Sequence, residues 1–453
     1  MPDTAPRQLK LNAFLMNVGH HEAAWRHPLS EPQRGTDLEH YVHLAQVAER
    51  GLLDSIFFAD GLAVGPSLRY NAMGPVDPLT LLFALAARTE HIGLIATVST
   101  TYTSPFDVAR KFASLDHLSG GRAGWNIVTS GSGPEADNFD PIPRFTHAER
   151  YARSEEYVQV AKALWDSWED GAIVADQATG IFADTGRIHE VNHQGDWFGV
   201  RGPLSVPRSP QGWPVLVQAG SSEDGRSFAA RHAEAVFTAH QSLASAQEFY
   251  ADLKARIAAE GRDPEAVKVL PGIVPILGDT PEDALANRAE LDGLISTEYA
   301  LKQLSWLLDL DATGFELDAP FPDLTAHLAT VQNNQSRSRL IVELALRDGL
   351  TTRELLAQLG GGRGHFVLAG TPEQIADHLQ TWFEQGAADG FNIMAPLLPS
   401  GLERFVDEVV PILQARGLFR TAYEGRTLRD RYGLPRPAGS TAARSADLLT
   451  AKA

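Results

Sequence analysis

The sequence contains no cysteine among its 453 residues. This absence excludes disulfides, thiolate-bound metals, iron–sulfur clusters and a cysteine nucleophile. Long apolar runs are also missing, because no window approaches the roughly 18 consecutive apolar residues that span a membrane. The first residues, MPDTAPRQLKLNAFLMNVGHH, lack the apolar core and cleavage site of a secretory signal. We therefore expect a cytoplasmic location and no membrane partner.

Basic residues are fewer than acidic residues. Lys and Arg number 39 against 57 Asp and Glu, which gives a formal net charge of −18. Such a chain repels polyphosphates on average, so nucleic acid is not expected as a partner. A small anionic substrate remains compatible, since it responds only to a local patch. The 43% hydrophobic and 21% charged residues are typical of a globular protein.

Short β-branched or aromatic runs alternate with helical stretches along the chain. Eight runs predict strands, at 9–18, 55–59, 92–99, 124–129, 214–219, 235–239, 267–277 and 391–395. Helical stretches lie between most of them, a pattern that favours a (β/α)8 TIM barrel. A doubly wound sheet is the rival fold. It usually has a glycine fingerprint after its first strand, and here that strand continues as NVGHHEAAW.

Two stretches break this alternation. We expect one barrel domain over residues 1–434 with large insertions near 171–213 and 309–365, the first carrying short antiparallel strands and the second being irregular. Residues 435–453 are rich in Ala, Ser and Pro, which predicts a flexible tail. The glycine run 360–364 predicts a hinge or lid segment.

Active sites of TIM barrels lie at the carboxyl ends of the strands. Ser221 and Ser222 follow the fifth strand and precede Glu223. They fit a helix N-cap alone, or a cap that also binds phosphate. His147 and Tyr151, four residues apart, share one helix face. They fit a surface pair or a phosphate or flavin contact, and spacing alone does not decide.

The 15 histidines raise the possibility of a metal site. His20 and His21 are adjacent, so only one of them could face a barrel mouth if they lie on a strand. No H-E-x-x-H motif is present. We expect no metal, and a metal-dependent barrel hydrolase stays a distant alternative.

Several segments carry a family resemblance. They are GHHEAAWRHP (19–28), FFADGLA (57–63), GLIATVSTTYTSPFDVARKFASLDHLSGGRAGWNIVTS (93–130), HAERYARSEEYVQVAKALWDSW (147–168), PVLVQAGSSEDGRSFAARHAEAVF (214–237) and AGTPEQIADHLQTWFEQGAADGFNIM (369–394). Together they resemble the nitrilotriacetate and dibenzothiophene-sulfone monooxygenase branch of the bacterial-luciferase-like flavin monooxygenases.

The resemblance implies a luciferase-like TIM barrel that uses reduced FMN as a cosubstrate, supplied by a separate NAD(P)H-dependent flavin reductase. A 4a-hydroperoxyflavin formed with O2 would pass one oxygen atom to a small organic substrate of xenobiotic, polycarboxylate or organosulfur type. A homodimer or homotetramer is expected. A deazaflavin-dependent oxidoreductase of the same superfamily and a non-catalytic flavin-binding protein are the alternatives.

The resemblance also assigns residues. The FMN contacts fall on Asp60, Thr97, His147, Tyr151, Ser221 and Ser222. His20 matches a substrate-side histidine with a positioning or proton-handling role, and Phe58 is expected beside it as a substrate contact. The segment 365–394 is closer to the aminopolycarboxylate members, and candidate cations for an anionic substrate are Arg26, Arg337, Arg339 and Arg363. The two insertions are expected to act as lids.

Overall fold

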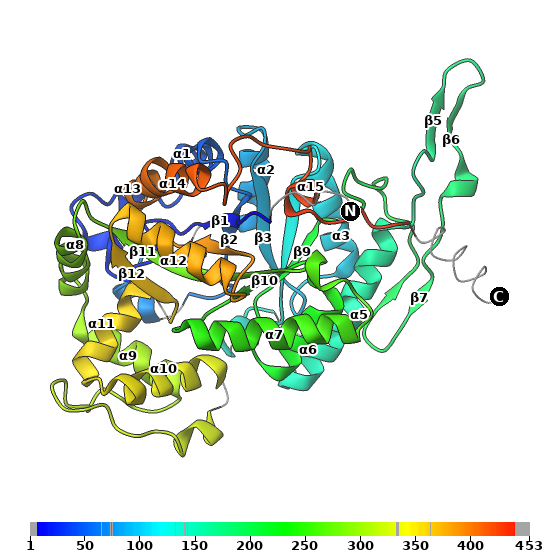
Figure 1. The fold of residues 1–453 in the computed structure, drawn as a ribbon. Coiled ribbons are helices and arrows are strands. Elements are labelled where there is room, and N and C mark those ends of the chain that lie inside the picture. The colour runs from blue at the N-terminus through cyan, green and yellow to red at the C-terminus, as the bar shows by residue number, and fades with distance from the viewer. Residues whose placement is uncertain are drawn as a thin grey trace.

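Eight parallel strands form a closed barrel (Figure 1). The structure, a computed structural model, describes residues 7–64, 66–72, 74, 76–131, 133–139, 142, 144–331, 335–362 and 364–439. Around the barrel the strand order is β10-β9-β4-β3-β2-β1-β13-β11, and pairing of β10 with β11 closes it. The strands are β1 (Lys10–Phe14), β2 (Ser55–Phe58), β3 (Gly93–Ser99), β4 (Ala123–Val128), β9 (Val215–Gln218), β10 (Ala235–Thr238), β11 (Lys268–Leu277) and β13 (Gly390–Ile393). All eight predicted strands are present, and the prediction of a TIM barrel is confirmed.

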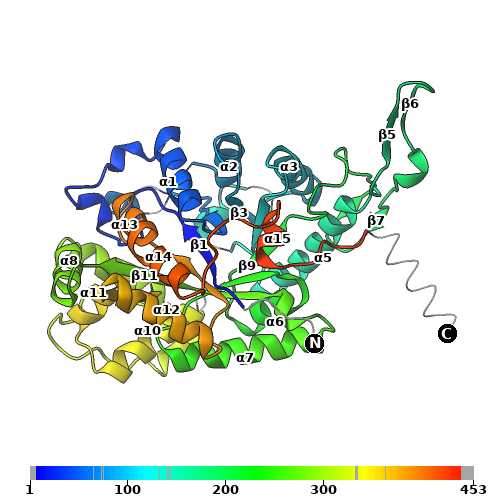
Figure 2. The same ribbon diagram turned by 45° about the horizontal axis from the view of Figure 1, so that its top comes forward.

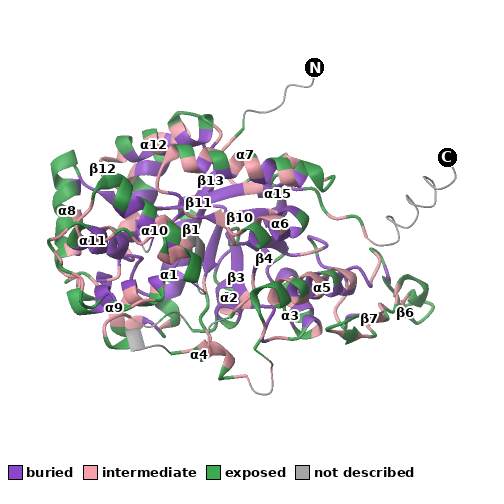
Figure 3. Cartoon of the chain, turned by 90° about the horizontal axis from the view of Figure 1, so that it is seen from below, coloured by how far each residue is buried: buried purple, intermediate pink, exposed green. Residues whose placement is uncertain are grey.

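Helices surround the barrel, with buried inner faces and exposed outer faces (Figure 3). They are α1 (Leu38–Arg50), α2 (Pro78–Ala86), α3 (Pro105–Leu118), α5 (His147–Trp165), α6 (Glu223–His232), α7 (Leu243–Ala259), α8 (Pro281–Gly293), α12 (Pro372–Glu384), α13 (Ser400–Arg404) and α14 (Val410–Ala415). Alternate strand side chains divide between this outer core and the barrel interior. In β1, Leu11 and Ala13 belong to the outer core, whereas Phe14 belongs to the interior cluster.

A short helix, α15 (Leu428–Tyr432), closes the barrel at the amino ends of the strands. Leu428 and Tyr432 belong to the interior cluster, and the Tyr432 hydroxyl donates to Asn12 Oδ1 over 2.7 Å. Arg429 forms an ion pair with Glu234 just before β10. The barrel is therefore plugged at this end, and a ligand would enter from the end where the carboxyl ends of the strands lie, which we call the mouth.

Residues 171–213 contain two antiparallel hairpins, β5 (Ile173–Asp176) with β6 (Ile181–Ala183) and β7 (His193–Gln194) with β8 (Gly199–Val200). The first hairpin projects away from the barrel (Figure 2). The second lies along the outside of α5, where Glu156 accepts hydrogen bonds from the backbone N–H groups of Trp197 and Phe198. The expected short antiparallel strands are confirmed. The Trp197 ring, between β7 and β8, lies 5.3 Å from the ring of Phe145, which directly precedes the amino end of α5, so the second hairpin extends toward the mouth. A role of this insertion as a lid stays a prediction.

Helices between residues 297 and 362 form a lobe, and the prediction of an irregular segment at 309–365 is wrong for 335–362, where two helices lie. Helices α9 (Thr297–Leu308), α10 (Gln335–Asp348) and α11 (Thr352–Gly362) bury a hydrophobic cluster of their own. Strand β12 (Phe366–Gly370), which the sequence analysis missed, follows the lobe and pairs in parallel with the second half of β11.

The glycine run does not form a hinge within the part of it that the structure describes. Gly360 and Gly362 lie in the last turn of α11, where added methyl groups would approach Ile295 Cδ1 to 2.4 Å and Val367 Cγ2 to 2.7 Å. These glycines allow close packing of the helix. Arg363, proposed from the sequence as an anion contact, lies outside the described residues.

The chain after Leu434 is anchored where it is described. Arg436 forms an ion pair with Asp170 over 2.6 Å, and the Pro437 carbonyl accepts from Arg208 Nη2 over 2.6 Å. Residues 440–453 of the predicted tail lie outside the described residues. The domain boundaries themselves stay a prediction.

Candidate active site

Thr97 and Asn126 form a polar wall in the barrel interior. They are register partners on β3 and β4, and both are buried. Thr97 Oγ1 donates to the Phe58 carbonyl over 2.8 Å and accepts from Asn126 Nδ2 over 2.9 Å. Asn126 Oδ1 is buried with no hydrogen-bond partner among the described residues. A buried acceptor left open in this way suits a ligand that brings an N–H donor.

Aromatic rings line the other side of the interior. The ring centroids of Phe14 and Phe57 lie 4.5 Å apart, and Phe237 lies 5.5 Å from Phe14. The His365 ring stacks on Phe237 at 5.0 Å. This half is apolar, so it would exclude water from a ligand held against the polar wall.

His20 lies at this aromatic half. It is 2% exposed, and its ring centroid is 4.5 Å from that of Phe14. His20 Nε2 is 2.9 Å from the Phe14 carbonyl oxygen. Since a carbonyl only accepts, Nε2 is the protonated nitrogen, and Nδ1 is the atom that could take up a proton.

Phe58 lies elsewhere. Its ring is fully buried in the outer core and contacts Tyr41 of α1 at 5.8 Å. Successive side chains of a strand point to opposite faces, so Phe57 enters the interior and Phe58 points away from it. The predicted neighbour of His20 is thus replaced by Phe14, and the structure does not support Phe58 as a substrate contact.

The amino ends of α5 and α6 meet beside β9. Ser222 caps α6, its Oγ accepting from the Gly225 N–H over 3.1 Å, while the Ser221 carbonyl accepts from Arg226 Nε over 3.0 Å. Gly220 permits this close approach, since a methyl group there would lie 3.1 Å from Gly225 Cα and 3.2 Å from the Tyr151 hydroxyl. Free N–H groups and hydroxyls at a helix amino end form a ready anion site.

His147 and Tyr151 belong to the same corner. Their rings lie 4.9 Å apart, and His147 Nδ1 is 3.0 Å from Asp224 Oδ2 in the first turn of α6. Arg150, one turn along α5 and missed by the sequence analysis, has a buried Nε without a hydrogen-bond partner among the described residues. The structure therefore brings four of the six predicted flavin contacts together, beside a cation.

Asp60 follows β2 on the rim. Although Asp60 as a whole is exposed, partial desolvation of its carboxyl raises its pKa to about 6, and the nearby Asp77 and Glu135 add to this. The Gly61 N–H donates to it over 2.9 Å. Asp60 therefore titrates close to neutral pH. Going round the barrel, Ser221 and Ser222 follow β9, and His147 and Tyr151 lie on α5 after β4. Thr97 lies on β3, and Asp60 follows β2.

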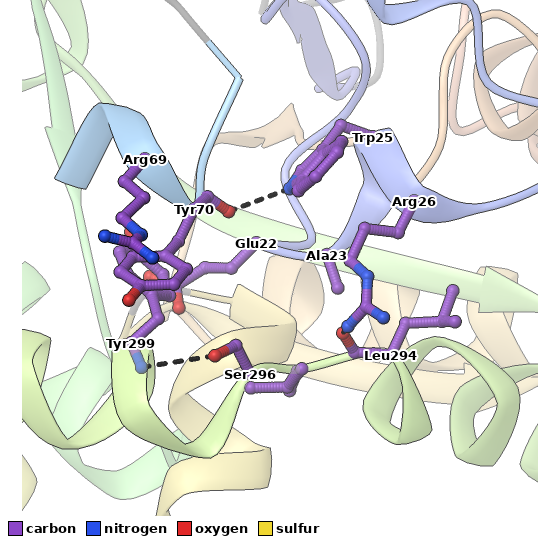
Figure 4. A pocket seen from close by; sticks show the side chains of 10 residues that line it. Glu22, Ala23, Trp25, Arg26, Arg69, Tyr70, Leu294, Ser296 and Tyr299 are labelled. Carbon is purple, nitrogen blue, oxygen red and sulfur yellow. Dashed lines mark hydrogen bonds between the residues drawn. The ribbon is translucent and has the colours of Figure 1, made fainter.

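Two cavities of about 260 Å³ each lie beside the mouth. The first is lined by Arg26, Arg69, Tyr70 and Tyr299, among others (Figure 4). The second includes Arg337 and residues of α9 and α11. None of the predicted flavin contacts lines either one, so these cavities are separate from the corner between α5 and α6.

No group of three or more His, Asp or Glu side chains suited to a metal ion is found in the described ranges. His240, which follows β10, is 2.9 Å from Thr238 Oγ1, and burial lowers its pKa to about 4. None of the described helices has the length and apolar character needed to cross a bilayer.

The chain is similar to known proteins in sequence and in fold. Residues 16–389 match the family described as "Luciferase-like monooxygenase". N-acetyl-S-(2-succino)cysteine monooxygenase of Bacillus subtilis (strain 168) is 50% identical over 432 residues, 95% of this chain and 98% of that protein. Nitrilotriacetate monooxygenase component A of Aminobacter aminovorans is 46% identical over 451 residues, 97% of this chain and 99% of that protein. A crystal structure of riboflavin lyase with modified FMN and riboflavin superposes with a TM-score of 0.84 at 30% identity, covering 95% of this chain and 97% of that one.

Proposed function

Since the chain belongs to the luciferase-like monooxygenase family, and is therefore an oxygenating enzyme, we propose that it oxygenates a small polycarboxylate with reduced FMN from a separate NAD(P)H-dependent reductase. The word "component" in the name of the nitrilotriacetate enzyme supports such a division of labour. A cytoplasmic location and a homodimer or homotetramer stay predictions.

The observation that carries the flavin proposal is the open acceptor Asn126 Oδ1. It lies one strand away from the anion site at Ser221 and Ser222. FMN has a phosphate at one end and ring N–H donors at the other, so these residues fit its two ends. The similar riboflavin lyase structure contains modified FMN, which supports a flavin ligand for this chain.

Reduced FMN, when bound, supplies the two electrons with which O2 gives one oxygen atom to the substrate and one to water. In this chain Ser221, Ser222, His147 and Tyr151 would bind the phosphate. Thr97 and Asn126 would orient the ring. Phe14, Phe57 and Phe237 exclude water, and His20 would hold or accept a proton on Nδ1.

The two named relatives support the substrate class. N-acetyl-S-(2-succino)cysteine and nitrilotriacetate each carry three carboxylates and an electron-rich sulfur or nitrogen atom. We therefore place the substrate of this enzyme among small tricarboxylates with one such atom.

The test supplies reduced FMN with a generic reductase, NADH and 18O2, in the presence of catalase. We expect a tricarboxylate substrate to gain one 18O atom, or to be cleaved to products carrying it, only when flavin, reductase and enzyme are all present. Turnover with NADH and no reductase would refute the two-component proposal. Activity with reduced deazaflavin instead of FMN would favour the deazaflavin alternative, and loss of activity with a chelator would favour the metal-dependent one.

A further inference from the structure

The two cavities beside the mouth share Glu22 and Tyr299 in their linings, so they lie next to each other, and we call the pair the recess. One wall is the segment 22–26 that follows β1, and the other is formed by α9 and α11 of the helical lobe. In Figure 4, Arg26 and Arg69 lie on opposite sides of the first cavity, with Tyr299 on the side of Arg69 and Glu22 and Ala23 between the two arginines. The recess is therefore built jointly by the barrel rim and the lobe.

The charge of this recess is opposite to that of the chain. Arg26, Arg69 and Arg337 line it against a single carboxylate, that of Glu22. Arg26 donates to the Leu294 carbonyl, and the Arg69 guanidinium lies 5.5 Å from the centre of the Tyr70 ring. In the described part of the chain, no carboxylate lies within ion-pair distance of Arg26 or Arg69; Glu298, which pairs with Lys302, attracts Arg69 from further away. These two guanidinium groups form a local positive patch that can bind an anion, although the net charge of the protein is −18.

The lining between the arginines suits the carbon skeleton of such an anion. Tyr70 and Tyr299 contribute rings that lie 5.8 Å apart, and Leu294 and Ile295 contribute apolar surface. The Tyr299 hydroxyl accepts from Asn71 Nδ2 over 3.1 Å and from Gln303 Nε2 over 2.8 Å, which fixes its position. Arginine binds carboxylate through two parallel N–H donors, so two arginines on opposite walls select a molecule with more than one carboxylate.

The side chain of His365 connects the recess to the barrel interior. Arg337 Nη2 lies 3.4 Å from His365 Nε2, and the His365 ring stacks on Phe237 inside the barrel. Glu22, on the shared wall, is two residues from His20. A molecule whose carboxylates occupy the recess can therefore extend an uncharged atom to the mouth.

We infer that Arg26 and Arg69 of this recess bind carboxylates of a polyanionic substrate and so determine the specificity of the enzyme, with Arg337 next to the reacting end. The inference rests on the proposed function for its substrate class. The inference goes beyond the proposed function because it names the residues that bind the substrate. These residues lie apart from every predicted flavin contact.

The test compares Arg26→Gln and Arg69→Gln with Arg353→Gln. Arg353 lies on α11 of the same lobe, forms an exposed ion pair with Asp318 and lines neither cavity, so its loss changes the net charge equally. With nitrilotriacetate as substrate, each recess variant is expected to raise KM at least about tenfold, the effect of losing one charge-assisted hydrogen-bonded contact, with kcat changed much less. Arg26→Lys should recover part of the loss, and Glu22→Gln should lower KM because it removes the opposing charge.

FMN affinity measured by fluorescence should be the same in all these variants. A KM for nitrilotriacetate within twofold of that of Arg353→Gln in both recess variants would overturn the inference, as would an enzyme that oxygenates only uncharged sulfones. If no substrate is oxygenated with reduced FMN, the proposed function fails instead. Even then, calorimetric titration with nitrilotriacetate tests the proposed binding site, because binding needs no turnover. Loss of the heat of binding in Arg26→Gln supports the inference, and binding equal to that of the wild type refutes it.

Discussion

Replacing Asn126 by leucine should change flavin affinity and protein stability in opposite directions. In the flavin-free protein Asn126 Oδ1 is buried without a partner among the described residues, while Nδ2 donates to Thr97. Leaving a polar atom unpaired in this way costs about 1–3 kcal/mol, and one ordinary hydrogen bond contributes about 0.5–1.5 kcal/mol. Asn126→Leu removes both, so the free energy of unfolding should stay unchanged or rise by up to about 2 kcal/mol. Flavin binding should lose a buried hydrogen bond, which weakens it roughly 5- to 150-fold.

A matched control lies at the other end of the barrel. Asn12 also faces the interior, but its side chain is satisfied, donating to Asn392 Oδ1 over 3.1 Å and accepting from Tyr432. Asn12→Leu should lower stability, because it leaves both partners buried and unpaired, and should leave flavin affinity unchanged.

The assay combines thermal unfolding of the flavin-free protein with titration of FMN, oxidised in air and reduced under anaerobic conditions. If Asn126→Leu binds reduced FMN as tightly as the wild type, the flavin ring does not lie against β4 and the proposed orientation is wrong. Loss of stability in Asn126→Leu equal to that in Asn12→Leu would show that Oδ1 is satisfied in the flavin-free protein.

Two further predictions concern the rim. Ser222→Ala should lower the free energy of unfolding by about 1 kcal/mol through loss of the helix cap. It should also weaken binding of FMN but not of riboflavin, because only FMN has a phosphate. Equal losses of affinity for both ligands would contradict a phosphate role. Asp60→Asn should stabilise the flavin-free protein more at pH 7 than at pH 4. The wild-type carboxyl has a pKa raised to about 6 in the folded state and an ordinary pKa of about 4 in the unfolded chain. Between about pH 4 and 6 it is therefore protonated when folded and ionised when unfolded. The free energy of unfolding of the wild type consequently falls as pH rises through that window. Parallel stability–pH curves for the two proteins would refute this.

The barrel was predictable because its strands are buried on both faces and therefore form continuous apolar runs. The same property explains the error at Phe58. In the run SIFFA both phenylalanines are apolar and both are buried, so the sequence does not reveal which faces inward. Register decides it, since Phe57 pairs with Phe14 of β1 and Ile95 of β3, both interior residues.

Ser221 and Ser222 could be found because a polar pair between a strand and a helix is a local signal. Asn126 and Arg150 could not be distinguished from other polar residues near the strand ends, since the unpaired atoms that set them apart are revealed only by the packed neighbours. The helical lobe was missed for a related reason. Glycines lower helix propensity, which hid the end of α11. In the structure Gly360–Gly362 are helical, and at Gly360 and Gly362 the contacts with Ile295 and Val367 leave no room for a side chain.

Strand β11 changes neighbours along its length, pairing with β10 at its start, with β13 at Gly272 and Ile273, and with β12 from Ile273 to Leu277. Its second half thus leaves the cylinder and continues as a two-stranded ribbon that supports the lobe. The seam between β11 and β13 is where new chain could be inserted during evolution without disturbing β9, β4, β3 or β2. Relatives sharing this architecture could vary in this single sector while the remaining strands keep their arrangement.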